Sequence, residues 1–149
     1  MNSPDFKNVE ILLVEDNPND ARLMLRALTK NKLTNQLLVV ENGEEALDFI
    51  FARGKYSTRA VDDFPRVVLL DLKLPKVSGL DVLKQIKKDD RTKSIPVVIL
   101  TSSKEEKDII EAYTLGVNSY IVKPVNFENF ALTIKEIGLY WLLINIPPV

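Results

Sequence analysis

Four short apolar runs in this chain each end in a polar residue that can take part in chemistry. The runs are continuous stretches rich in Val, Ile and Leu, which is typical of strands buried on both faces of a parallel sheet. Parallel strands point the same way, so their polar ends should meet at one sheet edge, where open α/β sheets bind ligands. The runs are residues 9–14 before Glu15 and Asp16, 67–70 before Asp71, 97–100 before Thr101, and 120–122 before Lys123. The sequence therefore predicts one pocket that gathers three acids, a hydroxyl and a lysine.

The rest of the chain alternates between strand-like and helix-like segments. Residues 37–40 form a further apolar run, and Asn17 to Asp20 read as a helix start with an acid near the positive end of the helix dipole. Five strand-and-helix units predict a three-layer α/β sandwich in one domain over residues 1–149. The polar stretch at about 55–65 is long for a connection, so we expect a surface insertion there. We expect an extended final helix and tail over 126–149.

Composition excludes several classes of protein. A net charge of −1 offers no basic surface for nucleic acid or for an anionic membrane. No apolar run approaches the roughly 20 residues that span a bilayer. Residues 1–8 lack the apolar core of a signal peptide, so we expect a cytoplasmic protein. The chain has neither Cys nor His, so any metal ion bound here should be a hard one that prefers oxygen ligands.

The three acids predicted at the sheet edge need a cation. Glu15, Asp16 and Asp71 would repel one another there, which would raise at least one carboxyl pKa unless a cation is shared. A small set of oxygen ligands suits Mg²⁺, whose coordination is commonly completed by water and a phosphate. Lys123 offers a positive charge for the same phosphate, and Thr101 offers a hydroxyl donor. These residues favour phosphoryl transfer to an aspartate, and their types alone leave open which one.

Several motifs occur in an order that resembles the receiver domain of two-component response regulators. Asp71 and Thr101 are 30 positions apart, and Thr101 and Lys123 are 22 apart, which matches the habit of that family. The resemblance covers nearly the whole chain and implies a flavodoxin-like, doubly wound α/β fold with a five-stranded parallel sheet in the order 2-1-3-4-5 and five helices. The motifs are Glu15-Asp16-Asn17, residues 70–75, Ser78-Gly79, residues 100–103, Gly116-Val117 and residues 120–124.

The resemblance implies a stand-alone response regulator of a phosphorelay, which signals through protein–protein contacts to an unknown downstream protein. Asp71 would accept a phosphoryl group from a sensor histidine kinase or a phosphotransfer protein. Mg²⁺ would be held by Asp16, by Asp71, by Glu15 through a water molecule and by the backbone carbonyl of Lys73. Glu15 replaces the Asp often seen at the first acidic position, and its carboxylate should still serve Mg²⁺ through water.

The resemblance also implies a conformational switch. Lys123 and Thr101 would bind the phosphoryl oxygens, and Tyr120 would move with Thr101 as the switch aromatic. From the sequence alone, Tyr120 is equally well read as a core residue. Lys73 and Ser103 occupy the positions where the family tunes its dephosphorylation rate.

Two features resemble the subgroup of single-domain regulators associated with bacterial phytochromes, which implies a phytochrome as the partner kinase. They are the insertion at 55–65 and the ending at residues 139–142. The ending is apolar on all sides, so it either folds back on the domain or forms a dimer interface. We favour a homodimer with contacts through Trp141 and Tyr140, because these residue types are enriched at interfaces.

The sequence leaves two alternatives to a phosphorylated receiver. A degenerate receiver would act as an interaction module without phosphorylation, but the intact acids, Thr101 and Lys123 argue against it. A phosphatase that forms an aspartyl phosphate would resemble an Asp-x-Asp motif, and the second position is Lys73, which cannot act as a general acid in the same way. We therefore expect no enzyme beyond self-catalysed phosphoryl acceptance and slow autodephosphorylation.

Overall fold

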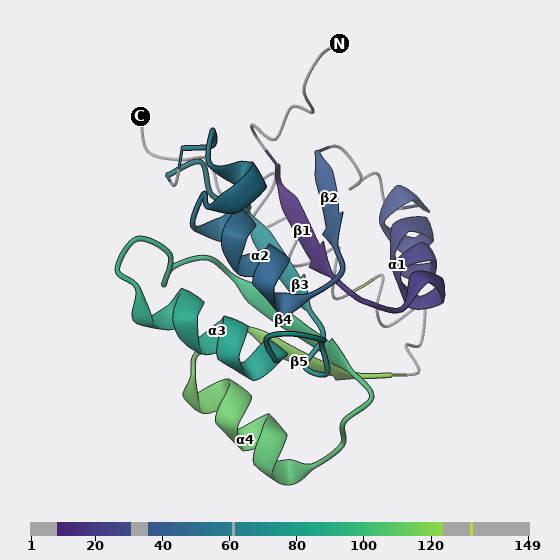
Figure 1. Cartoon of the computed structure of the whole chain (residues 1–149). Helices are drawn as coiled ribbons and strands as arrows, with labels where there is room; N and C mark the ends of the chain where they lie inside the picture. The colour runs from purple at the N-terminus through teal and green to yellow at the C-terminus, as the bar shows by residue number, and fades with distance from the viewer. Residues whose placement is uncertain (1–8, 31–35, 61, 124–131, 133–149) are drawn as a thin grey trace.

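Five parallel strands form one sheet in a computed structural model that describes residues 9–30, 36–60, 62–123 and 132. The order is β2-β1-β3-β4-β5, and every neighbouring pair is parallel. This confirms the predicted fold class and strand order (Figure 1). The strands are β1 (Ile11–Val14), β2 (Leu37–Val40), β3 (Val67–Leu70), β4 (Val97–Thr101) and β5 (Ser119–Val122).

Four α-helices lie in the described part of the chain, and three of them begin at a residue whose side chain caps the helix. Asn17, Asn42 and Ser78 accept hydrogen bonds from backbone N–H groups in the first turns that follow them. Of the final helix and tail expected over 126–149, only residue 132 is among the described residues, and Tyr140 and Trp141 lie outside them. The helices are α1 (Pro18–Lys30), α2 (Gly43–Ile50), α3 (Gly79–Lys88) and α4 (Glu106–Thr114).

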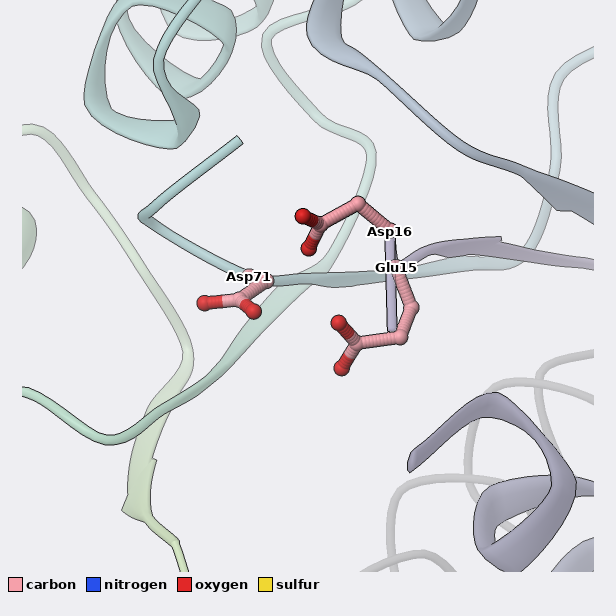
Figure 2. A group of neighbouring side chains, drawn as sticks. All are labelled: Glu15, Asp16 and Asp71. Atoms are coloured by element: carbon pink, nitrogen blue, oxygen red, sulfur yellow. The ribbon is translucent and has the colours of Figure 1, made fainter. Parts of the chain in front are cut away.

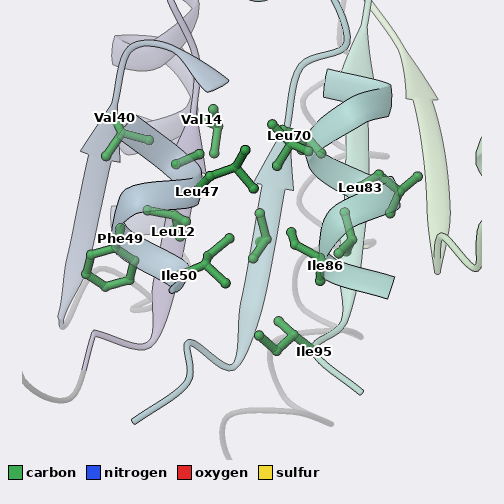
Figure 3. Close-up of a cluster of buried hydrophobic side chains, with 14 of the residues drawn as sticks. Leu12, Val14, Val40, Leu47, Phe49, Ile50, Leu70, Leu83, Ile86 and Ile95 are labelled. Atoms are coloured by element: carbon green, nitrogen blue, oxygen red, sulfur yellow. The ribbon is translucent and has the colours of Figure 1, made fainter. Parts of the chain in front are cut away.

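Successive residues of each buried strand face opposite sides of the sheet, and each side has its own core. On one side, Leu12 and Leu70 pack with Leu47 of α2 and Leu83 of α3 (Figure 3). On the other side, strand residues such as Leu13 pack with Met24 and Leu28 of α1. The helices α2, α3 and α4 therefore cover one face and α1 covers the other, which explains why the central strands are apolar along their whole length.

The segment after α2 is anchored to that helix by two buried side chains. Tyr56, in the short 3₁₀ helix η1 (Gly54–Tyr56), is 1% exposed and meets the ring of Phe49 edge-on at 5.2 Å between centroids. Its hydroxyl donates a 2.8 Å hydrogen bond to Oε1 of Glu45. The Arg59 guanidinium lies 4.0 Å from the centre of the Phe49 ring and donates to the carbonyl oxygen of Phe49. Because this stretch is polar in composition, its sequence did not indicate that Tyr56 and Arg59 would be buried.

Among the described residues, no helix combines the length and the apolar character that a membrane-crossing segment requires.

Candidate functional site

The three predicted acids converge at the carboxyl ends of β1 and β3. Val14 and Leu70 are partners in the pairing of these strands, so the residues that follow them lie side by side. The N–H of Asp71 donates a 3.1 Å hydrogen bond to the carbonyl oxygen of Val14. One carboxylate oxygen each from Glu15, Asp16 and Asp71 lie within 4.8 Å of one another (Figure 2). Glu15 and Asp71 are buried, whereas Asp16 is exposed.

Lys123, which follows β5, reaches across the sheet edge into this acidic cluster. Its Nζ lies 2.6 Å from Oε1 of Glu15 and 3.2 Å from Oδ2 of Asp71. A third carboxylate, that of Asp20, lies 2.8 Å away. Each of the three N–H bonds of the ammonium group thus has an acidic partner.

Asp20 is the site residue that reasoning from the sequence missed. It lies in the first turn of α1, where an acid is already explained by the helix dipole. Its position in the sequence could have indicated the site, because Asp20 follows Asp16 by one helical turn. It therefore lies at the N-terminal end of α1, which is close to the carboxyl ends of the strands. The structure adds it to the site because its carboxylate contacts Lys123.

Burial and neighbouring charges shift the pKa values of Glu15 and Lys123. Burial raises the pKa of the Glu15 carboxyl to about 7, and the charge of Asp71 adds to this effect, against the lowering by the hydrogen bond from Lys123. Burial alone would lower the pKa of Lys123, but its hydrogen bonds to Asp20 and Glu15 prevail, and the pKa lies above its usual value. A carboxyl with a pKa raised this far is one that an additional cation would hold ionised.

The donor set fits a hard divalent cation. Three carboxylates meet in a small volume, the chain has neither Cys nor His, and one exposed member leaves access from solvent. Lys73 lies at the same place, with its N–H donating a 3.3 Å hydrogen bond to Oδ1 of Asp71, while its side chain is exposed. The residues present therefore suit a divalent cation held beside Asp71.

Two glycines allow the loop after Asp71 to pass close to neighbouring backbone. A Cβ atom at position 79 would lie 2.1 Å from the carbonyl oxygen of Asp71, and one at position 43 would lie 2.0 Å from that of Val77. The N–H of Gly79 donates to the carbonyl oxygen of Leu72 at 2.8 Å. The absence of a side chain at Gly79 thus helps to fix the backbone that carries Asp71.

The predicted switch residues form a separate network beside the acids. Thr101 is fully buried, and its Oγ1 accepts a 3.3 Å hydrogen bond from the N–H of Ser103. The Ser103 hydroxyl donates to Oδ2 of Asp108 at 2.6 Å, and the Tyr120 hydroxyl donates to the Ser103 carbonyl oxygen at 3.0 Å. Tyr120 is half-buried and also packs against the core under α2 and α3, as expected for a core residue. Its role as a switch stays a prediction.

The backbone links this network to the lysine. The N–H of Lys123 donates a 2.7 Å hydrogen bond to the carbonyl oxygen of Thr101. Asp71, Thr101 and Lys123 thus lie at the carboxyl ends of three neighbouring strands, as the apolar runs before them predicted.

Comparison with known proteins agrees with this arrangement. Residues 11–135 match the family described as the response regulator receiver domain. The chain belongs to this family. It is similar to FilR2 of Methanothrix harundinacea, a probable methanogenesis regulatory protein, with 44% identity over 138 residues that make up 93% of this chain and 86% of FilR2. It is also similar to the response regulator Rcp1 of Synechocystis sp., with 38% identity over 132 residues that make up 89% of this chain and 88% of Rcp1.

Among solved structures, the chain is similar to response regulators associated with phytochromes. The Mn²⁺-bound form of Rcp1 has a TM-score of 0.78 with 37% identity, covering 93% of this chain and 98% of that one. The phosphorylated cyanobacterial phytochrome response regulator RcpA has a TM-score of 0.79 with 38% identity, covering 94% and 98%. The bacteriophytochrome response regulator RtBRR has a TM-score of 0.79 with 49% identity, covering 93% and 83%.

Membership of the family establishes the general role. Receiver domains act in two-component signalling, where their partners are histidine kinases, and they are phosphoryl acceptors rather than enzymes that turn over an external substrate. The acidic cluster of Glu15, Asp16 and Asp71 is consistent with a phosphoacceptor site that binds a divalent cation.

Proposed function

We propose that this receiver domain accepts a phosphoryl group on Asp71 from a phosphohistidine of a sensor kinase or of a phosphotransfer protein. The observation that carries the proposal is the position of the Asp71 carboxylate, which lies 3.2 Å from the Lys123 ammonium and beside two further acids. Glu15 also contacts this lysine, but Asp71 is the member of the acidic cluster whose backbone lies against Gly79.

The choice of Asp71 over its neighbours follows from their environments. Asp16 is exposed, so an acyl phosphate there would be open to water. The Glu15 side chain is 2% exposed against 10% for that of Asp71, so Glu15 is less accessible to a phosphoryl donor. Lys73 stands where an aspartyl-phosphate phosphatase would need a second Asp, which argues against turnover of external substrates.

In the proposed reaction, a carboxylate oxygen of Asp71 attacks the phosphorus atom as the phosphorus–nitrogen bond to the donor histidine breaks. The leaving imidazole keeps the electron pair of that bond and takes up a proton. Lys123 leaves the Asp71 carboxylate and binds a phosphoryl oxygen, so a positive charge lies where negative charge accumulates. Thr101 turns to donate to another phosphoryl oxygen, and Tyr120 follows it inward.

A divalent cation, Mg²⁺ in this proposal, would neutralise charge on the incoming phosphoryl oxygens when bound. Asp16 and Asp71 would hold it directly, Glu15 through a water molecule, and Lys73 through its backbone carbonyl. The acidic cluster, the raised pKa of Glu15 and the Mn²⁺-bound form of Rcp1 support this assignment. Lys73 and Ser103 would tune the rate of dephosphorylation. The existence of a phosphorylated form of the relative RcpA supports the proposal that this chain is phosphorylated.

The partner in this proposal is a phytochrome-type histidine kinase. The support comes from the relatives, since RcpA and RtBRR are both described as phytochrome response regulators. The chain spans most of the length of these relatives. In this proposal the receiver signals by contact with a downstream protein. A homodimer with contacts through Tyr140 and Trp141 remains part of the proposal.

Intact-mass measurement tests the proposal. The protein is incubated with Mg²⁺ and a small acyl phosphate donor, and a single phosphoryl adduct is expected on the wild type and none on Asp71→Asn. Asp90→Asn, which neutralises an exposed acid outside the site, serves as the matched control and should keep the adduct. Absence of an adduct on the wild type would point instead to a degenerate receiver, and continuous release of phosphate from unrelated esters would point to a phosphatase.

A further inference from the structure

Asp20, in the first turn of α1, forms an ion pair with Lys123, which follows β5. The carboxylate oxygen Oδ2 of Asp20 lies 2.8 Å from Nζ of Lys123, although 103 positions separate the two residues in the chain. The Lys123 side chain is 13% exposed and that of Asp20 is 31% exposed, so the pair is partly shielded from water. A contact of this kind is stronger than an ion pair that is fully open to solvent.

The three partners of Lys123 fall into two classes. Glu15 and Asp71 belong to the acidic cluster that would hold a cation, so a cation there competes with the ammonium for the same oxygens. Asp20 lies outside that cluster. It is therefore the one of these three carboxylates that can keep the ammonium when the other two turn to a cation.

We propose that Asp20 is a positioning residue that draws the Lys123 ammonium away from Glu15 and Asp71 and thereby leaves them free to bind a divalent cation. The inference rests on the proposed function, because it concerns the same cation and the same lysine. Without the Asp20 carboxylate, the ammonium would be shared between Glu15 and Asp71 alone. It would then compete more strongly with the cation.

Two simpler effects of Asp20 must be separated from this role. Its negative charge attracts cations through space, and its place in the first turn stabilises α1. Asp81 offers a matched control for the effect on the helix, and the Lys123→Ala background controls for the effect of charge. It occupies the first turn of α3, and its N–H donates to Oγ of the capping Ser78, just as the N–H of Asp20 donates to Oδ1 of Asn17. Among the described residues, Asp81 forms no ion pair.

The test measures the affinity for Mg²⁺ alone, by titration calorimetry on the unphosphorylated protein. Asp20→Asn is expected to weaken binding about fivefold, while Asp20→Glu keeps most of the affinity and Asp81→Asn leaves it unchanged. In a Lys123→Ala background, the competing ammonium is absent. There, Asp20→Asn should change the affinity by less than twofold.

Each remaining outcome overturns the inference. Equal affinity in wild type and Asp20→Asn would mean that Asp20 does not act on the cation site. The same fivefold loss with and without Lys123 would mean that Asp20 acts by its charge alone and not through the lysine. Failure of the proposed function has a different signature, because the wild type would then take up no phosphoryl adduct from the acyl phosphate donor, whatever the Mg²⁺ affinities of the wild type and Asp20→Asn.

Discussion

Nζ of Lys123 lies 2.6 Å from Oε1 of Glu15, and 108 positions separate these residues in the chain. The two side chains are 13% and 2% exposed, so the pair is largely removed from water. Lys123 nevertheless fails to hold the pKa of Glu15 near its ordinary value, because burial and the charge of Asp71 outweigh it. Burial of Glu15 therefore affects the pKa of its carboxyl more than the ion pair with Lys123 does.

The first prediction concerns the stability of the cation-free protein as a function of pH. The pKa of Glu15 rises from 4.5 to about 7 on folding, so the folded state binds more protons between these values, and the free energy of unfolding should fall as pH increases through this window. Between pH 5.5 and pH 8, the wild type should lose about 2 kcal/mol relative to Glu15→Gln. Urea denaturation in the presence of a chelator measures both proteins.

Added Mg²⁺ provides the check on this first prediction. A cation that binds the ionised Glu15 should raise the free energy of unfolding of the wild type more at pH 8 than at pH 5.5. Parallel pH profiles for wild type and Glu15→Gln would show that this carboxyl does not have a raised pKa in the folded protein.

The second prediction concerns the glycine beside Asp71. The Cβ atom of Gly79→Ala would lie 2.1 Å from the Asp71 carbonyl oxygen and 2.5 Å from Cα of Leu72, so the backbone must move. We expect a loss of about 3 kcal/mol in the free energy of unfolding and a marked loss of the Asp71 adduct. Denaturant titration and intact mass check the two effects.

Gly116→Ala is the comparison for this substitution. Gly116 has a φ of +100°, and its nearest neighbours are side-chain atoms of Lys87 at 3.7 Å or more. The expected loss of about 1 kcal/mol comes from backbone strain, and the adduct should persist. Equal losses of adduct in both variants would refute a specific role for Gly79.

The third prediction concerns the hydrogen bond from Ser103 to Asp108. Ser103→Ala removes this 2.6 Å contact and the acceptor for the Glu105 N–H, so the free energy of unfolding should fall by about 1 to 2 kcal/mol. In a double-mutant cycle with Asp108→Ala, the two losses should add to more than the loss of the double variant. Ser102→Ala, at an exposed neighbour, should change stability by less than about 0.5 kcal/mol. Strict additivity would rule out the contact in solution.

The fourth prediction concerns the anchor of the segment after α2. Tyr56→Ala should lower the free energy of unfolding by about 3 to 5 kcal/mol, because it removes a buried ring that packs on Phe49. Tyr56→Phe keeps the ring, loses the hydrogen bond to Glu45 and should cost about 1 kcal/mol. Tyr113→Ala removes a ring that is 52% exposed and should cost far less than Tyr56→Ala. Similar losses at positions 56 and 113 would contradict the buried position of Tyr56.

The fold was predictable because the strands are buried on both faces and are therefore apolar along their length. The runs ending at Val14, Leu70 and Leu100 correspond to β1, β3 and β4. The strand β4 extends one residue further, to Thr101, and β5 begins one residue earlier than its run, at Ser119. The convergence of Glu15, Asp16, Asp71 and Lys123 followed from parallel strand direction alone, because polar residues at such ends must share an edge.

Other parts of the site could not be read from the chain. The contact of Asp20 with Lys123 depends on how α1 sits against the end of β5, and the helix dipole already explained an acid at that position. The bond between Ser103 and Asp108 depends on the path of the loop before α4. The burial of Tyr56 could not be predicted, because its neighbours in the sequence are polar. It depends instead on packing against the ring of Phe49.

The most direct measurement locates the phosphoryl group itself. The protein is phosphorylated with a small acyl phosphate donor and Mg²⁺, and the acyl phosphate is reduced with borohydride, which converts the modified aspartate to homoserine. Peptide mass spectrometry then identifies the residue. The account predicts homoserine at position 71 and at no other acid. Homoserine at position 16 or 20, or an unmodified peptide around Asp71 in a protein that carries the adduct, would contradict it.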